Sequence, residues 1–299
     1  MSTIACINAT SRTLTYLIGQ SLSEPSPPEI RAIVRSESRF LSKLPPSILQ
    51  SGKIPPQLTV HEYSKYSDTA PLIPILAGVQ TVYVALGIND NKLTTLNQDV
   101  LQALVSTLAA SKPGNTPRSP TKIVLLSAFP VLPSRLSLIQ SGKAPFMERF
   151  LHSSVVNNQY MDLIRAQSFL EKQSLWLDWT IISPGLIVND SSPAELDGPD
   201  ATFSLVAEDS SSAADAEPRP ISYTRLARAM LLAGNDSDHV GKYIVPMPTG
   251  RNVQFGWQAM EVQREVFSNF LFSQVLPAAT TWIAFGIVCA AGGYAYAVR

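Results

Sequence analysis

The first twenty residues combine an apolar run, a short polar loop and a helical stripe. Ile4 to Ile7 suits a short strand that is buried on both faces, and Leu14, Leu17, Ile18 and Leu22 share one face of a helix. Dinucleotide-binding folds hold phosphate groups at such a strand, loop and helix. The start of the helix offers unpaired N–H groups and the positive end of its dipole to an anion.

The same alternation of strand and helix patterns continues along the chain. Between the helical patterns, Pro-rich stretches read as surface loops, and residues 189–218 show little periodicity and could be partly disordered or form a lid. Further strands are expected at 29–35, 58–63, 81–87, 122–127, 179–184 and 242–246, and helices at 93–111, 145–173 and 226–233. This order predicts an α/β fold with a doubly wound, mainly parallel Rossmann sheet.

The domain organisation follows from these patterns. Residues 1–262 contain these elements and are expected to form one Rossmann-like α/β domain.

The candidate phosphate loop lacks the three glycines of the usual dinucleotide fingerprint. Asn8, Ser11 and Leu14 stand at their positions. Asn tolerates a positive φ and Ser can cap a helix, whereas Leu brings a branched side chain to a place of close backbone approach. If the loop still binds a pyrophosphate, its residues Asn8, Thr10, Ser11 and Arg12 would do so.

Two other strand ends carry candidate cofactor residues. Arg35 ends the second expected strand, where an Arg suits the 2′-phosphate of NADP and an acidic residue suits NAD. A solvated Arg at a strand end is the alternative. Gly87 ends the fourth expected strand and permits close backbone approach to a ligand.

Composition excludes several classes of protein. Lys plus Arg equals Asp plus Glu, with 23 of each, so nothing suggests nucleic acid as a partner. Cys6 lies in an expected core strand and Cys289 in an apolar tail, which makes a disulfide between them implausible and fits a reducing compartment. The three His residues lack metal-ligand spacing, so we expect no metal site.

The C-terminal segment is apolar. No charged residue occurs between Val266 and Val298, and a run of about 23 residues is enough to cross a ~30 Å hydrocarbon core. We therefore expect a transmembrane tail helix over residues 275–298, with the domain in the cytosol. The alternative is a C-terminal helix that is buried against the domain or a partner.

Candidate catalytic residues are expected at the carboxyl edge of the sheet. Ser127 ends the fifth expected strand and could orient a substrate carbonyl, and Tyr160 on the following helix could exchange its proton. A phenol needs a nearby cation for this near neutral pH. Ile164 occupies the position of the usual lysine, and Arg165 follows it. Purely structural roles for these residues are the alternative.

Several segments together resemble NmrA-like atypical short-chain dehydrogenases. These are INATSRTL at the N-terminus, IRAIVR, TVYVALG, KIVLLS, YMDLIRAQSFLEKQ, LDWTIISPG and ISYTRLARAMLLAG, which occur in the family's order. Tyr160-x-Asp162-Leu163-x-Arg165-Ala166, followed by the strand DWT and then PG, is most similar to the fungal averufin-oxidase-type subgroup.

The resemblance implies a function and an alternative to it. It implies that residues 1–262 form an NAD(P)-binding Rossmann-like domain whose small C-terminal part, 185–255, is the substrate region. It also implies an NAD(P)-dependent oxidoreductase that acts on a small hydrophobic substrate, of aromatic polyketide type, in fungal secondary metabolism, and Arg35 leads us to expect NADP as the cofactor. Some members of the wider family are regulators that bind NADP, so a non-catalytic sensor or scaffold is the alternative. The oligomeric state and the direction of hydride transfer are open at this stage.

Overall fold

The chain is seen here as a computed structural model. It describes residues 2–45, 48–49, 53–66, 68–87, 93–111, 119–144, 148–149, 152, 157–185, 187–188, 202–209 and 221–249. All structural statements below refer to these residues.

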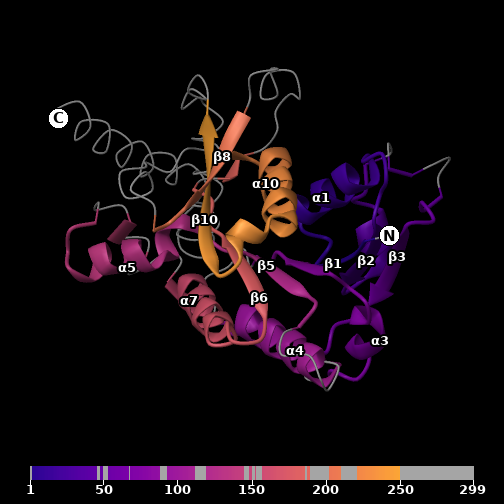
Figure 1. The fold of residues 1–299 in the computed structure, drawn as a ribbon, viewed down its shortest axis with the longest axis horizontal. Coiled ribbons are helices and arrows are strands. Elements are labelled where there is room, and N and C mark those ends of the chain that lie inside the picture. The colour runs from indigo at the N-terminus through magenta and orange to yellow at the C-terminus, as the bar shows by residue number, and fades with distance from the viewer. Residues whose placement is uncertain are drawn as a thin grey trace, which may run out of the picture.

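A twisted sheet forms the centre of the molecule (Figure 1). Its strand order is β3-β2-β1-β4-β5-β6-β10-β8, and every neighbouring pair is parallel except β10 with β8. The strands are β1 (Thr3–Ile7), β2 (Glu29–Val34), β3 (Leu58–Glu62), β4 (Thr81–Val84), β5 (Lys122–Leu126), β6 (Asp178–Ile182), β8 (Thr202–Ala207) and β10 (Lys242–Thr249). The predicted doubly wound, mainly parallel α/β sheet is confirmed.

Helices cover both faces of the sheet (Figure 1). One face carries α1 (Arg12–Leu22), α2 (Glu37–Leu41) and α10 (Tyr223–Asn235). The other carries α3 (Leu72–Leu76), α4 (Leu96–Ala110) and α7 (Asn157–Glu171). Strands β2 and β3 are added to one side of β1, and strands β4 to β6 to its other side, so the strand order reverses between β1 and β4. Ligands of open α/β sheets bind at the carboxyl edge of such a switch point.

Two apolar clusters, one on each face, bury the periodic positions of these elements. Leu14, Leu17 and Ile18 of α1 are fully buried against the first face, together with Leu226 and Met230 of α10. Leu14, which replaces the third glycine, therefore fills the core between helix and sheet. Burying one such side chain contributes about 1.5–3 kcal/mol.

Lys122 joins the amino end of β5 to the end of α10. Its Nζ donates to the carbonyl oxygens of Ala233 (2.6 Å) and Asp236 (2.8 Å). Burial lowers the pKa of Lys122, and the carboxylates of Asp236 and Asp178 act in the opposite direction. The ammonium group thus satisfies carbonyls that the helix end leaves free, and it fixes α10 against the sheet.

Some elements were absent from the sequence prediction. β8 lies within the stretch expected to be irregular, and α5 (Pro133–Gln140) follows a short 3-10 turn, η1 (Phe129–Val131), in another such stretch. β7 (Ile187–Val188) and β9 (Ile221–Ser222) form a small separate sheet, and η3 (Ser237–His239) precedes β10.

The expected membrane-spanning tail needs correction. In the ranges given above, no helix combines the length and apolarity that a membrane crossing needs. The longest of these helices, α4 and α7, have 15 residues each, about 22 Å against a ~30 Å hydrocarbon core. For the part of the chain that the structure describes, the fold class is therefore corrected to the α/β sheet alone, with no transmembrane helix. Residues 275–298 themselves lie outside the described residues.

Candidate functional site

Asn8 shapes the loop between β1 and α1. Its φ is +61°, a left-handed conformation that favours Gly and is also accessible to Asn. Its Nδ2 donates to Ala85 O at 2.9 Å, and its Oδ1 accepts from Thr10 Oγ1 at 3.0 Å. Asn8 thus reproduces the turn of the missing first glycine and adds a link from β1 to the end of β4.

Ser11 starts the helix as its N-cap. Its Oγ accepts from Leu14 N at 3.3 Å, and its own N–H donates to Asn8 O at 2.8 Å. Thr15 Oγ1 lies within hydrogen-bond distance of Ala9 O and Ser11 O, and it shares its hydrogen between these two carbonyl oxygens of the loop. The loop therefore has internal hydrogen bonds, and the first turn of α1 faces the carboxyl edge of the sheet, as an anion site requires.

Basic side chains gather around this loop. Lys43 Nζ donates to Thr10 O at 3.0 Å. Burial lowers the pKa of Lys43, as do the positive charges of Arg39 and Arg12. Arg12 also lies over the Tyr223 ring, 5.0 Å from its centroid. We call Arg12, Arg39 and Lys43 the basic cluster; positive charges gathered at one edge attract an anionic ligand.

Arg35 is the next candidate cofactor residue. It is exposed at the end of β2. Burial and Tyr63 raise the pKa of Tyr66 to about 12, and the charge of Arg35 opposes this rise, which places Arg35 near Tyr66. Gly87 follows β4, and open space surrounds the position where a Cβ would lie. Both residues are at the carboxyl edge, where the sequence placed them.

Ser127 lies at the carboxyl end of β5 and contacts α7. Its N–H donates to Ile182 O at 2.7 Å, and its Oγ accepts from Gln167 Nε2. Both side chains are buried. Because the amide donates, the hydroxyl hydrogen of Ser127 is available to another acceptor.

Tyr160 lies in the first turn of α7 and contacts a histidine. The ring centroids of His152 and Tyr160 are 4.7 Å apart with an interplanar angle of 49°. His152 Nε2 lies 2.7 Å from Pro130 O, in the turn that follows Ser127. Burial and the carboxylate of Glu148 raise the pKa of Tyr160 well above its ordinary value. Its phenol is therefore protonated near neutral pH.

The charges near Tyr160 are paired with each other. Arg135 Nε donates to Glu148 Oε2 at 3.3 Å, and its guanidinium lies 5.2 Å from the Phe129 ring centroid. Arg165 is exposed on α7, and Ile164 is half-buried. The structure thus brings Tyr160 together with His152, whereas Arg165 points to solvent.

The sequence pattern does not single out Gln167 as a partner of the predicted pair. His152 precedes Tyr160 by eight residues, so the sequence allows it to share a helix face with Tyr160, with a structural role as the alternative. Gln167 lies seven residues after Tyr160 on the same helix, so a helical projection could have suggested it. The contact of His152 depends on the position of Pro130, and no local pattern signals that.

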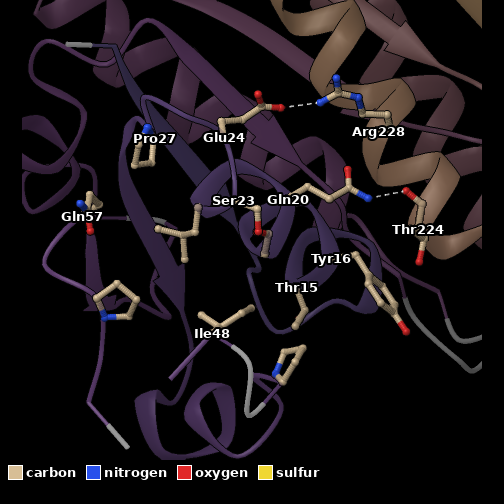
Figure 2. A pocket seen from close by; sticks show the side chains of 14 residues that line it. Thr15, Tyr16, Gln20, Ser23, Glu24, Pro27, Ile48, Gln57, Thr224 and Arg228 are labelled. Atoms are coloured by element: carbon tan, nitrogen blue, oxygen red, sulfur yellow. Dashed lines mark hydrogen bonds and ion pairs between the residues drawn. The ribbon is translucent and has the colours of Figure 1, made fainter. Parts of the chain in front are cut away.

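Two cavities in the described part of the chain lie away from this edge. One of about 810 Å³ runs along the outer side of α1, and Figure 2 shows Gln20, Ile48 and Gln57 on its walls. Two links to α10 close one side, the ion pair of Glu24 with Arg228 at 2.7 Å and the bond from Gln20 Nε2 to Thr224 O at 2.9 Å. This cavity contains none of the predicted catalytic or cofactor residues, so we base the site on the carboxyl edge.

The fold and the geometry of the β1–α1 loop define a Rossmann-like α/β protein. Solved structures agree with the fold. The oxidoreductase ylbE from Lactococcus lactis is 15% identical with a TM-score of 0.57, and covers 84% of this chain and 92% of its own. Gre2 from Candida albicans is 12% identical with a TM-score of 0.54, and covers 90% of this chain and 83% of its own. No family model matches the chain.

Curated relatives give the family. Oxidoreductase aflX of Aspergillus parasiticus is 30% identical over 191 residues, 64% of this chain and 67% of the relative. Oxidoreductase ordB of Dothistroma septosporum is 25% identical over 273 residues, 90% of this chain and 92% of the relative. The chain belongs to this family of fungal oxidoreductases, and the NmrA-like resemblance is confirmed.

Proposed function

We propose that the chain is an NADP-dependent oxidoreductase that acts on a neutral, hydrophobic, aromatic compound at the carboxyl edge of its sheet. The observation that carries this proposal is the loop of Asn8 and Ser11 with the basic cluster around it. Asn8 holds the left-handed turn, and Lys43 lies 3.0 Å from Thr10 O beside two further cations.

The donor set of the loop fits a dinucleotide. The pyrophosphate would bind at the first turn of α1, where helix dipole and N–H groups favour an anion. Arg39 and Lys43 follow β2, where the adenosine ribose lies in this fold, so they are the residues that would hold a 2′-phosphate. A bound nicotinamide would supply or accept the hydride of the reaction.

The surroundings of Tyr160 support the substrate class. His152 and Tyr160 bring two half-buried aromatic rings together, and Arg135 with Glu148 neutralise each other. A planar neutral compound suits such a set. Ser127 and Tyr160 would donate hydrogen bonds to its carbonyl oxygen. The oxidoreductases of the family support a substrate from fungal secondary metabolism.

Thermal unfolding of the full chain tests cofactor binding. NADPH at a hundredfold excess over its Kd should stabilise the protein by about 2.7 kcal/mol. NADH should stabilise it less. The double variant Arg39→Ala/Lys43→Ala should lose the preference for NADPH, whereas the control Arg228→Ala, whose guanidinium pairs with Glu24, should keep it. An unchanged melting temperature with both nucleotides would refute the proposal.

A non-catalytic sensor is the second candidate. The observation in its favour is that Ile164 stands where a lysine would assist Tyr160 and that Arg165 is exposed. A sensor would bind NADPH in the same assay without oxidising it in the presence of a planar aromatic carbonyl compound such as 9,10-phenanthrenequinone.

A further inference from the structure

The proposed reaction needs a group that exchanges a proton near neutral pH, and Tyr160 does not supply it. Burial and Glu148 keep its phenol protonated, so Tyr160 can donate a hydrogen bond but is a poor proton acceptor. Arg165 is always charged and is exposed to solvent.

His152 is placed to exchange this proton. Its ring touches that of Tyr160, and its Nε2 lies 2.7 Å from Pro130 O. A carbonyl oxygen can only accept, so Nε2 must carry the hydrogen in this contact. The neutral imidazole then has its lone pair on Nδ1. Within the described ranges, no hydrogen bond occupies that nitrogen.

We propose that His152 Nδ1 carries the proton of the reaction. The inference rests on the proposed function. In the oxidative direction, the C–H bond of a substrate alcohol breaks as the hydride leaves to the nicotinamide. The O–H bond breaks as its proton moves to Nδ1, and a C=O bond forms. In the reductive direction, the imidazolium returns this proton to the carbonyl oxygen. Tyr160 holds that oxygen by a hydrogen bond throughout.

The charged groups around the ring are consistent with this role. Tyr160 contacts the His152 ring from α7. Glu148 precedes His152 by four residues and pairs with Arg135 of α5. The ion pair of Glu148 with Arg135 carries no net charge. Imidazole is also the side chain that commonly exchanges protons near neutral pH.

The first test reads the tautomer and does not depend on turnover. The chain has only three His residues, so selective ¹⁵N-histidine labelling of the full chain gives few signals, and His152 is assigned by their loss in His152→Gln. We expect the Nε2–H tautomer with an unprotonated Nδ1 in the neutral form. A predominant Nδ1–H tautomer would overturn the proposal, and this measurement uses the unaltered protein.

The second test follows NADPH oxidation with 9,10-phenanthrenequinone. The wild-type kcat should fall as pH rises from about 6 to about 8, because reduction needs the imidazolium. His152→Gln keeps a donor for Pro130 O but cannot carry the proton. Its kcat should be lower by about tenfold or more at the acidic end and flat across this range, with KM nearly unchanged.

The control is His61→Gln, which alters a histidine of β3 and should keep the wild-type profile. A wild-type pH profile in His152→Gln would overturn the role of His152. NADPH that still raises the melting temperature in that case would leave the proposed function standing, so the two failures are distinguishable.

Discussion

The carboxylate of Asp162, fully buried on α7, accepts two hydrogen bonds from Asn97 at the start of α4. Asn97 N and Nδ2 lie 2.9 and 3.0 Å from Oδ2, and Gln98 N lies 3.2 Å from Oδ1. The buried charge satisfies N–H groups that a helix start leaves free. It therefore fixes the turn of α7 that carries Tyr160 against α4.

Replacing Asp162 by Asn should destabilise the fold. The amide group presents donors to the N–H groups of α4, so the free energy of unfolding should fall by about 3 kcal/mol. Urea denaturation measures this. Asp99→Asn is the matched control because Asp99 lies in the same turn of α4 but is exposed; its effect should stay within about 1 kcal/mol. Equal losses in the two variants would contradict the anchoring role.

Asn8 should tolerate Gly better than Ala. Asn8→Gly keeps the left-handed φ and loses the bond to Ala85 O, at a cost of about 1 kcal/mol. Asn8→Ala also places an unsuited residue in that conformation, which adds about 1–2 kcal/mol. Denaturant unfolding of both variants gives the difference. An Ala variant as stable as the Gly variant would show that the turn is not fixed at φ near +61°.

Gly234 should not accept a side chain while Tyr83 is present. A Cβ at Gly234 would lie 2.8 Å from Tyr83 Cζ and closer still to its hydroxyl oxygen, and the Tyr83 ring is fully buried. Gly234→Ala should cost about 2 kcal/mol despite the better helix propensity of Ala. The double variant with Tyr83→Phe should recover at least half of that loss, because the hydroxyl, which has no hydrogen-bond partner in the described ranges, is gone.

The control for the comparison of Gly234→Ala with Tyr83→Phe is Gly19→Ala. A Cβ at position 19 would meet the flexible tip of Ile48 at 3.1 Å. Stability should change little or rise, and Tyr83→Phe should not alter that result. Coupling between positions 19 and 83 would point to a global effect instead of a local clash.

NADPH binding should weaken at alkaline pH through Lys43. The pKa of Lys43 in the folded chain lies below its ordinary value. Between these two pKa values the folded chain binds fewer protons than the unfolded chain, so the contribution of Lys43 to stability increases as pH rises through that range. A phosphate beside the ammonium favours its charged form, and binding then takes up a proton. The Kd for NADPH should therefore rise between about pH 7.5 and about pH 10.

Lys43→Met separates this effect from general alkaline changes. The variant should bind more weakly at neutral pH and show a smaller rise in Kd, whereas Lys172→Met, at the end of α7, should follow the wild type. Isothermal titration calorimetry at both pH values gives Kd and proton uptake. An identical pH dependence in the wild type and Lys43→Met would exclude Lys43 from the anion site.

The strands of the sheet were predictable because their apolar runs are nearly continuous. Val82 to Val84 and Ile123 to Leu125 are buried on both faces, which leaves an unambiguous signal. Thr202–Ala207 was not predicted because an edge strand needs only one neighbour, and its surroundings in the sequence are polar. The left-handed conformation of Asn8 and the helix cap by Ser11 could be predicted from the sequence because both depend on local chemistry.

The candidate site was harder to predict from the sequence than the fold. Arg35 follows from the strand pattern and stays a prediction for the 2′-phosphate. The contact of Lys43 with Thr10 O joins residues 33 positions apart, and no local pattern signals it. The contact of His152 with Tyr160 depends on a carbonyl in the turn after β5. Such contacts join residues whose distance in sequence says nothing about their distance in space.

The order of strands also has a consequence for synthesis on the ribosome. β6 pairs on one side with β5 and on the other with β10, which ends at Thr249. When residues up to β6 have left the exit tunnel, its outer edge still has unpaired N–H and C=O groups. This edge stays open to other chains until some sixty further residues have been added, and nascent chains are most exposed to mispairing during that interval.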